Sequence, residues 1–371
     1  MSLNNINKDV KNSDLSEPDT SGLFCQQPFA NLEVNQWGQA RTCCAYWMNK
    51  SIGNIKTKPI EDVINSEQAQ KIRASILDGS FKFCNKMTCP LIQGNCLPKK
   101  EDVTDPYYKD IIDNNRTHIN TVRYVNFLWD LSCNLECPSC RKMKILNVKG
   151  DDYQQSLDIQ NSVINYVFNS NTQDEVIFNI TGSGDPFGSK IFRDFLIDFD
   201  GTKYPHIKIN LQTNGVMFTK KMWELMSKCH DNIGTVLVSI DAATEETYDK
   251  VRVGGDWKIL MSNLDMLSTL RTNNQIDHLR LDFVVQLENY KEMIPAINLM
   301  ESFDGVDGIY FSIVTDWASW DRDTFKKQAI WMPDNKYYQD FLNTLKNNIF
   351  ESSNVELGTL SEFYRKAQQE T

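Results

Sequence analysis

Residues 121–140 read TVRYVNFLWDLSCNLECPSC, a strand pattern rich in Val, Phe and Tyr followed by three cysteines in a CxxxCxxC spacing. Cys133, Cys137 and Cys140 can face one point only from a curled loop. Three thiolates at one point would bind an iron–sulfur cluster and leave one iron without a protein ligand, open to a substrate. Structural zinc usually takes four protein ligands, and the next histidine along the chain is His206. Zinc and chance clustering stay open as alternatives.

From this motif onwards, predicted strands alternate with helical segments whose apolar residues recur at three- and four-residue spacing. Alternation of this kind predicts βαβ units and a parallel sheet, either curled into a barrel or open and doubly wound. In both arrangements, binding sites form at the C-terminal ends of the strands. The six predicted strands begin near Thr121, Glu175, Ile207, Thr235, Leu279 and Gly308.

The composition of the 371-residue chain limits the classes of protein it can belong to. Its 41% of hydrophobic residues argues against a disordered chain, and its formal net charge of −10 argues against a general nucleic-acid-binding protein. No apolar run approaches the roughly 20 residues that cross a bilayer, and the N-terminus lacks a signal-peptide core. We therefore expect a globular, cytoplasmic protein with no membrane partner, whose ten cysteines stay reduced and available for metal or catalytic roles.

The CxxxCxxC loop after a first strand resembles the hallmark of the radical S-adenosylmethionine (SAM) enzymes, and the resemblance covers about residues 118–330. It implies an α/β fold with a partial (β/α)6 TIM-like barrel, in which Cys133, Cys137 and Cys140 hold a [4Fe–4S] cluster that binds SAM. In that family, an electron from the cluster cleaves SAM to a 5′-deoxyadenosyl radical, which abstracts a hydrogen atom from a substrate. The family often has an aromatic residue before the third cysteine, where this chain has Ser139, so the adenine contact is in doubt.

A glycine-rich segment after the second predicted strand, TGSGDP at 181–186, is similar to the GGEP segment of the same family. The resemblance implies that Gly182, Ser183, Gly184 and Asp185 bind SAM, because glycines admit a ligand close to the backbone and an acid can accept hydrogen bonds from an ammonium group. Taken alone, the segment is also typical of a tight turn.

Residues 239–242 read SIDA and residues 246–248 read ETY, and Arg252 follows them. Radical SAM sequences contain a similar series in the same order. They imply that Ser239 lies near the methionyl or ribose part of SAM and that Arg252 lies near its carboxylate. The alternative for Arg252 is a surface ion pair with a neighbouring aspartate. Gln286 and Asn289, at the end of the fifth predicted strand, are weaker candidates of the same kind.

Six cysteines precede the predicted barrel. A hairpin that turns at Gly38 would return Cys43 beside Cys25, and Cys84 and Cys89 would complete four ligands. This unit resembles the SPASM and twitch modules, which hold auxiliary iron–sulfur clusters but usually follow the barrel. Cys96 is the alternative fourth ligand, whereas strand alternation would point Cys44 to the opposite face. A structural zinc site and a second, incompletely ligated cluster stay open.

The predicted organisation has a mobile polar tail (1–22), a SPASM/twitch-like α+β domain (23–100), a connector (101–117), the partial barrel (118–335) and a C-terminal helical segment (336–371). The resemblance implies oxidation, epimerisation or crosslinking of a peptide or of a sugar or aminocyclitol, with flavodoxin or ferredoxin as the electron donor. A zinc-stabilised, non-enzymatic binding protein and a radical SAM scaffold that no longer turns over, serving as a partner protein, are the alternatives.

Overall fold

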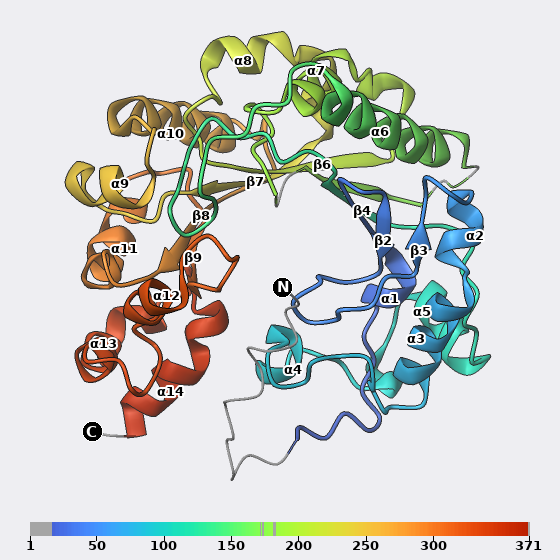
Figure 1. Ribbon diagram of the computed structural model, residues 1–371, viewed down its shortest axis with the longest axis horizontal. Coiled ribbons are helices and arrows are strands. Elements are labelled where there is room, and N and C mark those ends of the chain that lie inside the picture. Colours follow the sequence, from blue (N-terminus) through green and yellow to red (C-terminus); the bar gives the residue numbers. More distant parts are fainter. Residues whose placement is uncertain (1–16, 171, 173, 181–182, 370–371) are drawn as a thin grey trace.

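The computed structural model describes residues 17–170, 172, 174–180 and 183–369. These residues form one curved ten-stranded sheet with helices packed along its outer face (Figure 1). The two edges of the sheet are different strands, so within the described residues it is an open, partial barrel. In spatial order, the strands are β10 (Val355–Glu356), β9 (Gly308–Ile313), β8 (His278–Val285), β7 (Ile233–Ser239), β6 (Ile207–Thr213), β5 (Val176–Ile180), β4 (Tyr124–Leu128), β1 (Asn31–Asn35), β2 (Gln39–Arg41) and β3 (Gly53–Asn54).

Strands β4 to β9 are the six strands predicted from the sequence, and each pairs in parallel with the next. The predicted α/β class with a parallel (β/α)6 sheet is therefore confirmed. Their C-terminal ends share one edge of the sheet. The connecting helices are α6 (Asp151–Asn169), α7 (Lys190–Asp198), α8 (Lys220–Leu225), α9 (Glu245–Val251), α10 (Trp257–Thr272) and α11 (Met293–Glu301).

The apolar core lies between the sheet and these helices. Residues of each strand alternate between the two faces, so Phe127 of β4 points outward and packs against Phe192 and Phe195 of α7 at ring-centroid distances of 5.7 Å. The neighbouring Val125 is also fully buried. Burial of such side chains is the main favourable term that holds helices onto a sheet.

The inner face of the sheet is polar, and a row of asparagines crosses it. The side chain of Asn126 donates to Asn31 (2.8 Å), Asn179 donates to Asn126 (2.9 Å), and Asn210 donates to Asn179 (3.1 Å). These four amides lie on four adjacent strands, from β1 to β6. The inner face therefore presents hydrogen-bonding groups where a closed barrel would pack branched apolar side chains.

The N-terminal unit extends the same sheet rather than forming a separate layer. β1 pairs in parallel with β4, and β2 returns antiparallel to β1 through a turn in which Gly38 has a positive φ of 76°. The amphipathic stretch 60–77 forms two helices rather than one, because Ser66 caps a new helix by accepting from Ala69 N (3.3 Å). The helices of this unit are α1 (Gln27–Ala30), α2 (Ile60–Ile64), α3 (Glu67–Leu77) and α4 (Pro90–Gln93).

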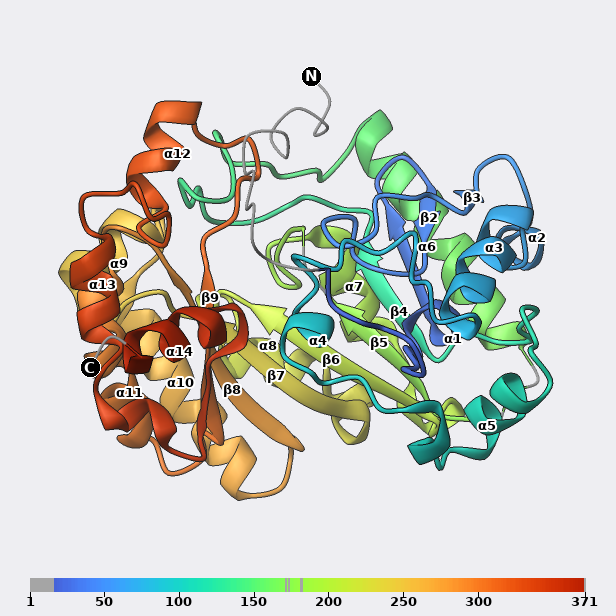
Figure 2. The ribbon, with the colours of Figure 1, turned by 90° about the horizontal axis from the view of Figure 1, so that it is seen from below.

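The remaining segments are more ordered than the sequence predicted. Residues 1–16 of the expected tail lie outside the described residues, but Thr20 is buried and its hydroxyl donates to the Gly79 carbonyl (2.9 Å). The expected connector contains α5 (Pro106–Asp113), which is labelled in Figure 2. The C-terminal segment adds the edge strand β10 beside β9. None of the described helices is long and apolar enough to cross a membrane. The helices of the C-terminal part are α12 (Arg322–Gln328), α13 (Tyr338–Thr344) and α14 (Ser361–Gln369).

Candidate functional site

The three cysteines of the CxxxCxxC motif lie on the long loop between β4 and α6, at the C-terminal edge of the sheet. Cys133 and Cys137 are buried and Cys140 is exposed. The loop curls because Cys133 pairs with Ile145 across it and Cys140 N donates to the Cys137 carbonyl (2.9 Å). The fold therefore places the predicted ligands on one curled loop, as their spacing required.

Each of the three sulfurs has an N–H donor. Cys133 Sγ accepts from Leu135 N (3.4 Å) and Asn214 Nδ2 (3.7 Å). Cys137 Sγ accepts from Arg252 Nη1 (3.8 Å), and Cys140 Sγ accepts from Arg141 Nη2 (3.6 Å). Donors of this kind stabilise thiolate sulfur and tune the potential of an iron–sulfur cluster.

Burial acts against these donors in the metal-free protein. It raises the pKa of the Cys133 thiol to about 11, and the nearby charge of Asp185 adds to the rise. Burial also raises the pKa of Cys137, whereas the charge of Arg252 lowers it. A metal centre that binds these sulfurs must therefore displace their protons.

Asp130 holds the cysteine loop in place through hydrogen bonds. This fully buried carboxylate accepts from Ser132 N (3.1 Å), Ser132 Oγ (2.9 Å), Asn147 Nδ2 (3.1 Å) and Ser189 Oγ (2.6 Å). These four bonds connect the two arms of the loop with the start of α7. Because the donors are all internal to the fold, Asp130 positions the loop.

The glycine-rich segment packs directly against the cysteine loop. Gly182 lies outside the described residues, and Ser183 Oγ donates to the Leu128 carbonyl (3.2 Å). A Cβ at Gly184 would lie 2.4 Å from the Ser132 carbonyl oxygen and 2.9 Å from that of Asp130. Gly184 therefore allows two backbones to approach each other.

Asp185 is buried, and both of its oxygens already have partners. One oxygen accepts from Phe187 N (2.9 Å) and Gly188 N (3.0 Å), and the other accepts from Thr213 Oγ1 (2.8 Å) and Asn214 N (2.8 Å). The four acceptor positions of an ionised carboxylate are thus filled. What the structure shows for Asp185 is a positioning role, and its predicted contact with SAM stays a prediction.

Arg252 reaches the cysteine loop from the end of α9. Its guanidinium forms an ion pair with Asp241 (Nη2–Oδ2, 2.8 Å) and donates to Cys137 Sγ. The alternative of an ion pair with a neighbouring aspartate is therefore present, but the pair is buried rather than at the surface. Ser239 ends β7 opposite Asp282 of β8, on the inner face.

Several polar atoms around this edge are buried without a hydrogen-bond partner within the described part of the chain. They include Arg252 Nε, Tyr248 Oη and Gln286 Nε2. A buried donor without an acceptor costs about 1–3 kcal/mol, so such atoms often face a ligand or a water molecule. The two nitrogen donors suit a ligand that brings oxygen acceptors.

The N-terminal cysteines converge on a cavity of about 250 Å³. Cys25, Cys43, Cys84 and Cys89, the four favoured ligands, all line it, together with Asn126 of β4. Burial raises the pKa of Cys25 to about 12 and that of Cys84 to about 11, and the negative charges of neighbouring thiolates add to both. Four thiols lining one cavity fit a cluster with four protein ligands.

Two details of the predicted ligand set change. Cys44 also lines the cavity, so its expected position on the opposite face is wrong: β2 ends at Arg41, and strand alternation does not extend to Cys44. Cys96 is exposed and does not line the cavity.

Among the described residues, no three His, Cys, Asp or Glu side chains meet as ligands of a single metal ion. The ligands of a cluster bind different irons and do not need to meet in that way.

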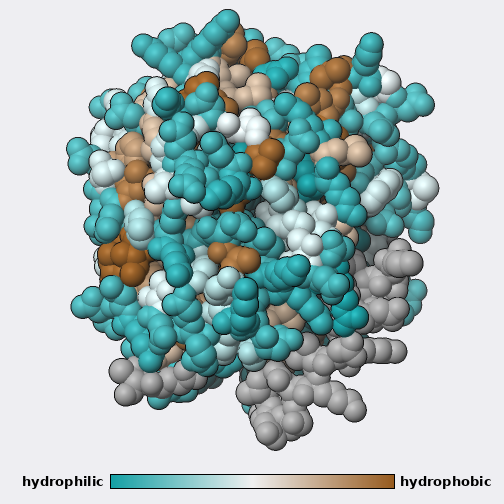
Figure 3. Space-filling model, turned by 60° about the vertical axis from the view of Figure 1, so that its left-hand side comes forward, coloured by the Kyte–Doolittle hydropathy of each residue, from teal (hydrophilic) through white to brown (hydrophobic). Residues whose placement is uncertain are grey.

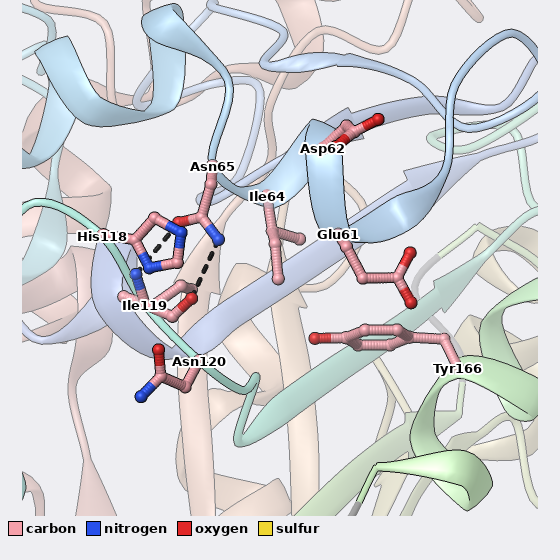
Figure 4. Close-up of a pocket in the computed structure, with 8 residues that line it drawn as sticks. All are labelled: Glu61, Asp62, Ile64, Asn65, His118, Ile119, Asn120 and Tyr166. Atoms are coloured by element: carbon pink, nitrogen blue, oxygen red, sulfur yellow. Dashed lines mark hydrogen bonds between the residues drawn. The ribbon is translucent and has the colours of Figure 1, made fainter.

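A second cleft, of about 480 Å³, lies between α2, α6 and the segment leading into β4 (Figure 4). The side chain of Asn65 joins the two sides of the cleft, because it forms paired hydrogen bonds with the backbone of Ile119. Glu61, Asp62 and Tyr166 face this cleft, and it contains no cysteine. It is separate from the two cysteine sites.

Comparison with protein families identifies the N-terminal unit. Residues 25–97, which include all six N-terminal cysteines, match the family SPASM, described as an iron-sulfur cluster-binding domain. Residues 25–97 form a SPASM domain. The SPASM module recognised in the sequence is thus confirmed, and so is its position ahead of the barrel strands.

No curated protein sequence matches the chain. Among solved structures, SuiB of Streptococcus suis bound to the precursor peptide SuiA is 13% identical, with a TM-score of 0.43, over 80% of this chain and 64% of that one. The protein anSMEcpe with bound AdoMet is 19% identical, with a TM-score of 0.40, over 62% of this chain and 58% of that one. The radical SAM methyltransferase TsrM of Kitasatospora setae, bound to tryptophan and a SAM analog, is 12% identical, with a TM-score of 0.32, over 49% of this chain and 34% of that one. In each case the aligned part is less than two thirds of the other chain.

Proposed function

We propose that the protein is a radical SAM enzyme. Cys133, Cys137 and Cys140 would hold a [4Fe–4S] cluster with one open iron for SAM. The observation that supports this most is the curled loop at the C-terminal edge of the sheet, where each of the three sulfurs accepts from an N–H donor. When bound, such a cluster supplies the electron that cleaves SAM to the radical that takes a hydrogen atom from the substrate.

The chain's own residues would orient SAM at this edge. Arg252 Nε and Gln286 Nε2 are buried donors that a carboxylate or hydroxyl of SAM would satisfy. Ser239, Ser183 and the glycine-rich segment would line the same edge. Because the Asp185 carboxylate already accepts four hydrogen bonds, we assign it to holding the loop in place rather than to the SAM ammonium group.

The SPASM domain would hold an auxiliary [4Fe–4S] cluster through Cys25, Cys43, Cys84 and Cys89. Such a cluster can accept an electron from a substrate, which would make the reaction a net oxidation; epimerisation and crosslinking are the other outcomes to distinguish. The polar inner face, with its row of asparagines, fits a substrate with many hydrogen-bonding groups. A peptide and a sugar or aminocyclitol both have that chemistry.

The test is anaerobic reconstitution with iron and sulfide, metal analysis, and an assay for 5′-deoxyadenosine with SAM and dithionite. The wild type should bind about eight irons and form 5′-deoxyadenosine. A variant with Cys133, Cys137 and Cys140 changed to Ala should bind about four and form none. Deoxyadenosine from that variant would contradict the assignment.

Two other results would lead to the alternatives. Zinc with little iron, and no deoxyadenosine, would indicate a zinc-stabilised binding protein. SAM binding by the reconstituted protein without cleavage under strong reductant would indicate a scaffold that no longer turns over.

A further inference from the structure

The segment that follows the third cysteine has an unusual surface. Residues 141–149 read RKMKILNVK, with four basic residues and no acidic one, in a chain of net charge −10. Met143, Leu146 and Val148 are 67%, 49% and 51% exposed. Lys142, Lys144 and Lys149 are exposed beside them. We call residues 142–149 the basic platform.

Hydrogen bonds to the cysteine loop and to Asp130 hold the platform in place. Ile145 O accepts from Cys133 N (2.9 Å), Asn147 N donates to Ser132 Oγ (2.8 Å), and the Asn147 side chain donates to Asp130. These two anchors alternate with the exposed apolar side chains. The apolar residues therefore face outward because the anchored backbone turns them to solvent.

Exposed large apolar residues are few, and several gather here. On the face drawn in Figure 3, hydrophilic side chains predominate and apolar ones form separate small patches. Three of the exposed large apolar residues, Met143, Leu146 and Val148, lie within six consecutive residues of the platform. Apolar groups that are grouped in this way and surrounded by charge mark an interaction site.

The platform also follows Cys140, the exposed member of the three motif cysteines. Cys140 is exposed, and Arg141 Nη2 lies 3.6 Å from its Sγ. Residues 101–371 have 27 basic and 40 acidic side chains, so most of this part of the surface repels an acidic protein. An acidic partner would therefore be steered to the platform, beside Cys140.

We propose that the basic platform docks an acidic protein that donates one electron. This inference rests on the proposed function, which consumes an electron that the chain's own side chains do not supply. The donor would be a protein with a flavin or an iron–sulfur centre. It would be oxidised by one electron, and the group held by Cys133, Cys137 and Cys140 would be reduced by one.

The test uses a variant with Lys142, Lys144 and Lys149 changed to Glu. A matched control changes Lys220, Lys221 and Lys228, which are exposed on and after α8, to Glu. Purified acidic flavodoxin is the probe. Its binding to each full-length protein without SAM is measured at two salt concentrations, and deoxyadenosine formation is measured with reduced flavodoxin and, separately, with dithionite.

The platform variant should bind flavodoxin about 10- to 100-fold more weakly than wild type, because three attractive charges become repulsive. For the same reason, added salt should weaken its binding much less than that of the wild type, or strengthen it. Its flavodoxin-driven rate should fall, whereas its dithionite-driven rate should stay at the wild-type level. The control variant should match the wild type in all of these.

Equal flavodoxin binding by wild type and platform variant would overturn the inference. So would a platform variant that binds flavodoxin normally but a peptide substrate poorly, because the platform would then serve the substrate. Absence of deoxyadenosine from wild type with dithionite would overturn the proposed function itself, and the docking role would fall with it.

Discussion

Replacing Asp185 with Asn tests whether this residue positions the loop. The change keeps the shape of the side chain but turns one oxygen into an N–H₂ group. Both oxygens accept from backbone N–H groups, one from Phe187 and Gly188 and the other from Asn214. A backbone N–H can donate but cannot accept a hydrogen bond. In either orientation of the amide that replaces the Asp185 carboxylate, its N–H₂ group therefore faces at least one backbone N–H. Only an ionised carboxylate satisfies all the donors.

The structure sets the size of the effect. In the better orientation, the amide nitrogen faces Thr213, whose hydroxyl can rotate to accept, and only the N–H of Asn214 is left unsatisfied. A buried unsatisfied donor costs about 1–3 kcal/mol, and bonds to a charged acceptor are worth about 1.5–3 kcal/mol each. We therefore expect Asp185→Asn to lower the free energy of unfolding by about 2–4 kcal/mol.

The assay is urea-induced unfolding of the metal-free, SAM-free protein under reducing conditions. Because no cofactor is present, a loss of stability reports the internal hydrogen bonds alone. Asp198→Asn is the matched control: Asp198 is exposed on the neighbouring α7, and its change should cost less than about 0.5 kcal/mol. An Asp185→Asn variant as stable as the control would refute the positioning role and return Asp185 to the SAM contact.

Three further predictions use other parts of the structure. Cys84→Ala should remove the iron of the SPASM domain, whereas Cys96→Ala, outside the cavity, should retain it; iron analysis after reconstitution checks both. Arg252→Ala should lower the free energy of unfolding of the metal-free protein by about 3–5 kcal/mol, because it leaves the buried Asp241 unpaired; an effect below about 1 kcal/mol would show that the pair is dispensable. Burial raises the pKa of Asp282 to about 6, from about 3.9 in the unfolded chain. Between these values the folded state binds more protons, so the free energy of unfolding should fall as the pH rises from about 3 to 7, by about 3 kcal/mol in total from this group, and Asp282→Asn should show a correspondingly smaller fall.

The fold could be predicted well where local pattern decides it. The six parallel strands were predicted because each is a short run of β-branched and aromatic residues between helical repeats. The break between α2 and α3 could not be predicted from the local pattern, because it depends on a contact distant in sequence. Asn65 at the break binds the backbone of Ile119, 54 residues away, and Arg73 Nη1 donates to its side chain (3.2 Å). No local repeat reports such a contact.

The site shows the same division. Spacing predicted Cys133, Cys137 and Cys140 on one loop, but it did not reveal Asp130, Asn214 or Arg141, which hold that loop or donate to its sulfurs. Their signal in the sequence is weak: Asp130 and Asn214 follow the ends of strands, and Arg141 follows the third cysteine. Only the folded chain brings them together.

Strand β4 connects the two cysteine sites. Asn126, in the middle of β4, lines the SPASM cavity and donates to Asn31 of β1 (2.8 Å), and the cysteine loop leaves the C-terminal end of the same strand. Asn126 and Asn179 share the inner face, opposite the face on which Phe127 packs against α7. The SPASM cavity therefore faces the interior of the partial barrel. The N-terminal SPASM domain reaches this position because β1 adds in parallel beside the first barrel strand, so β4 adjoins both the SPASM cavity and the cysteine loop.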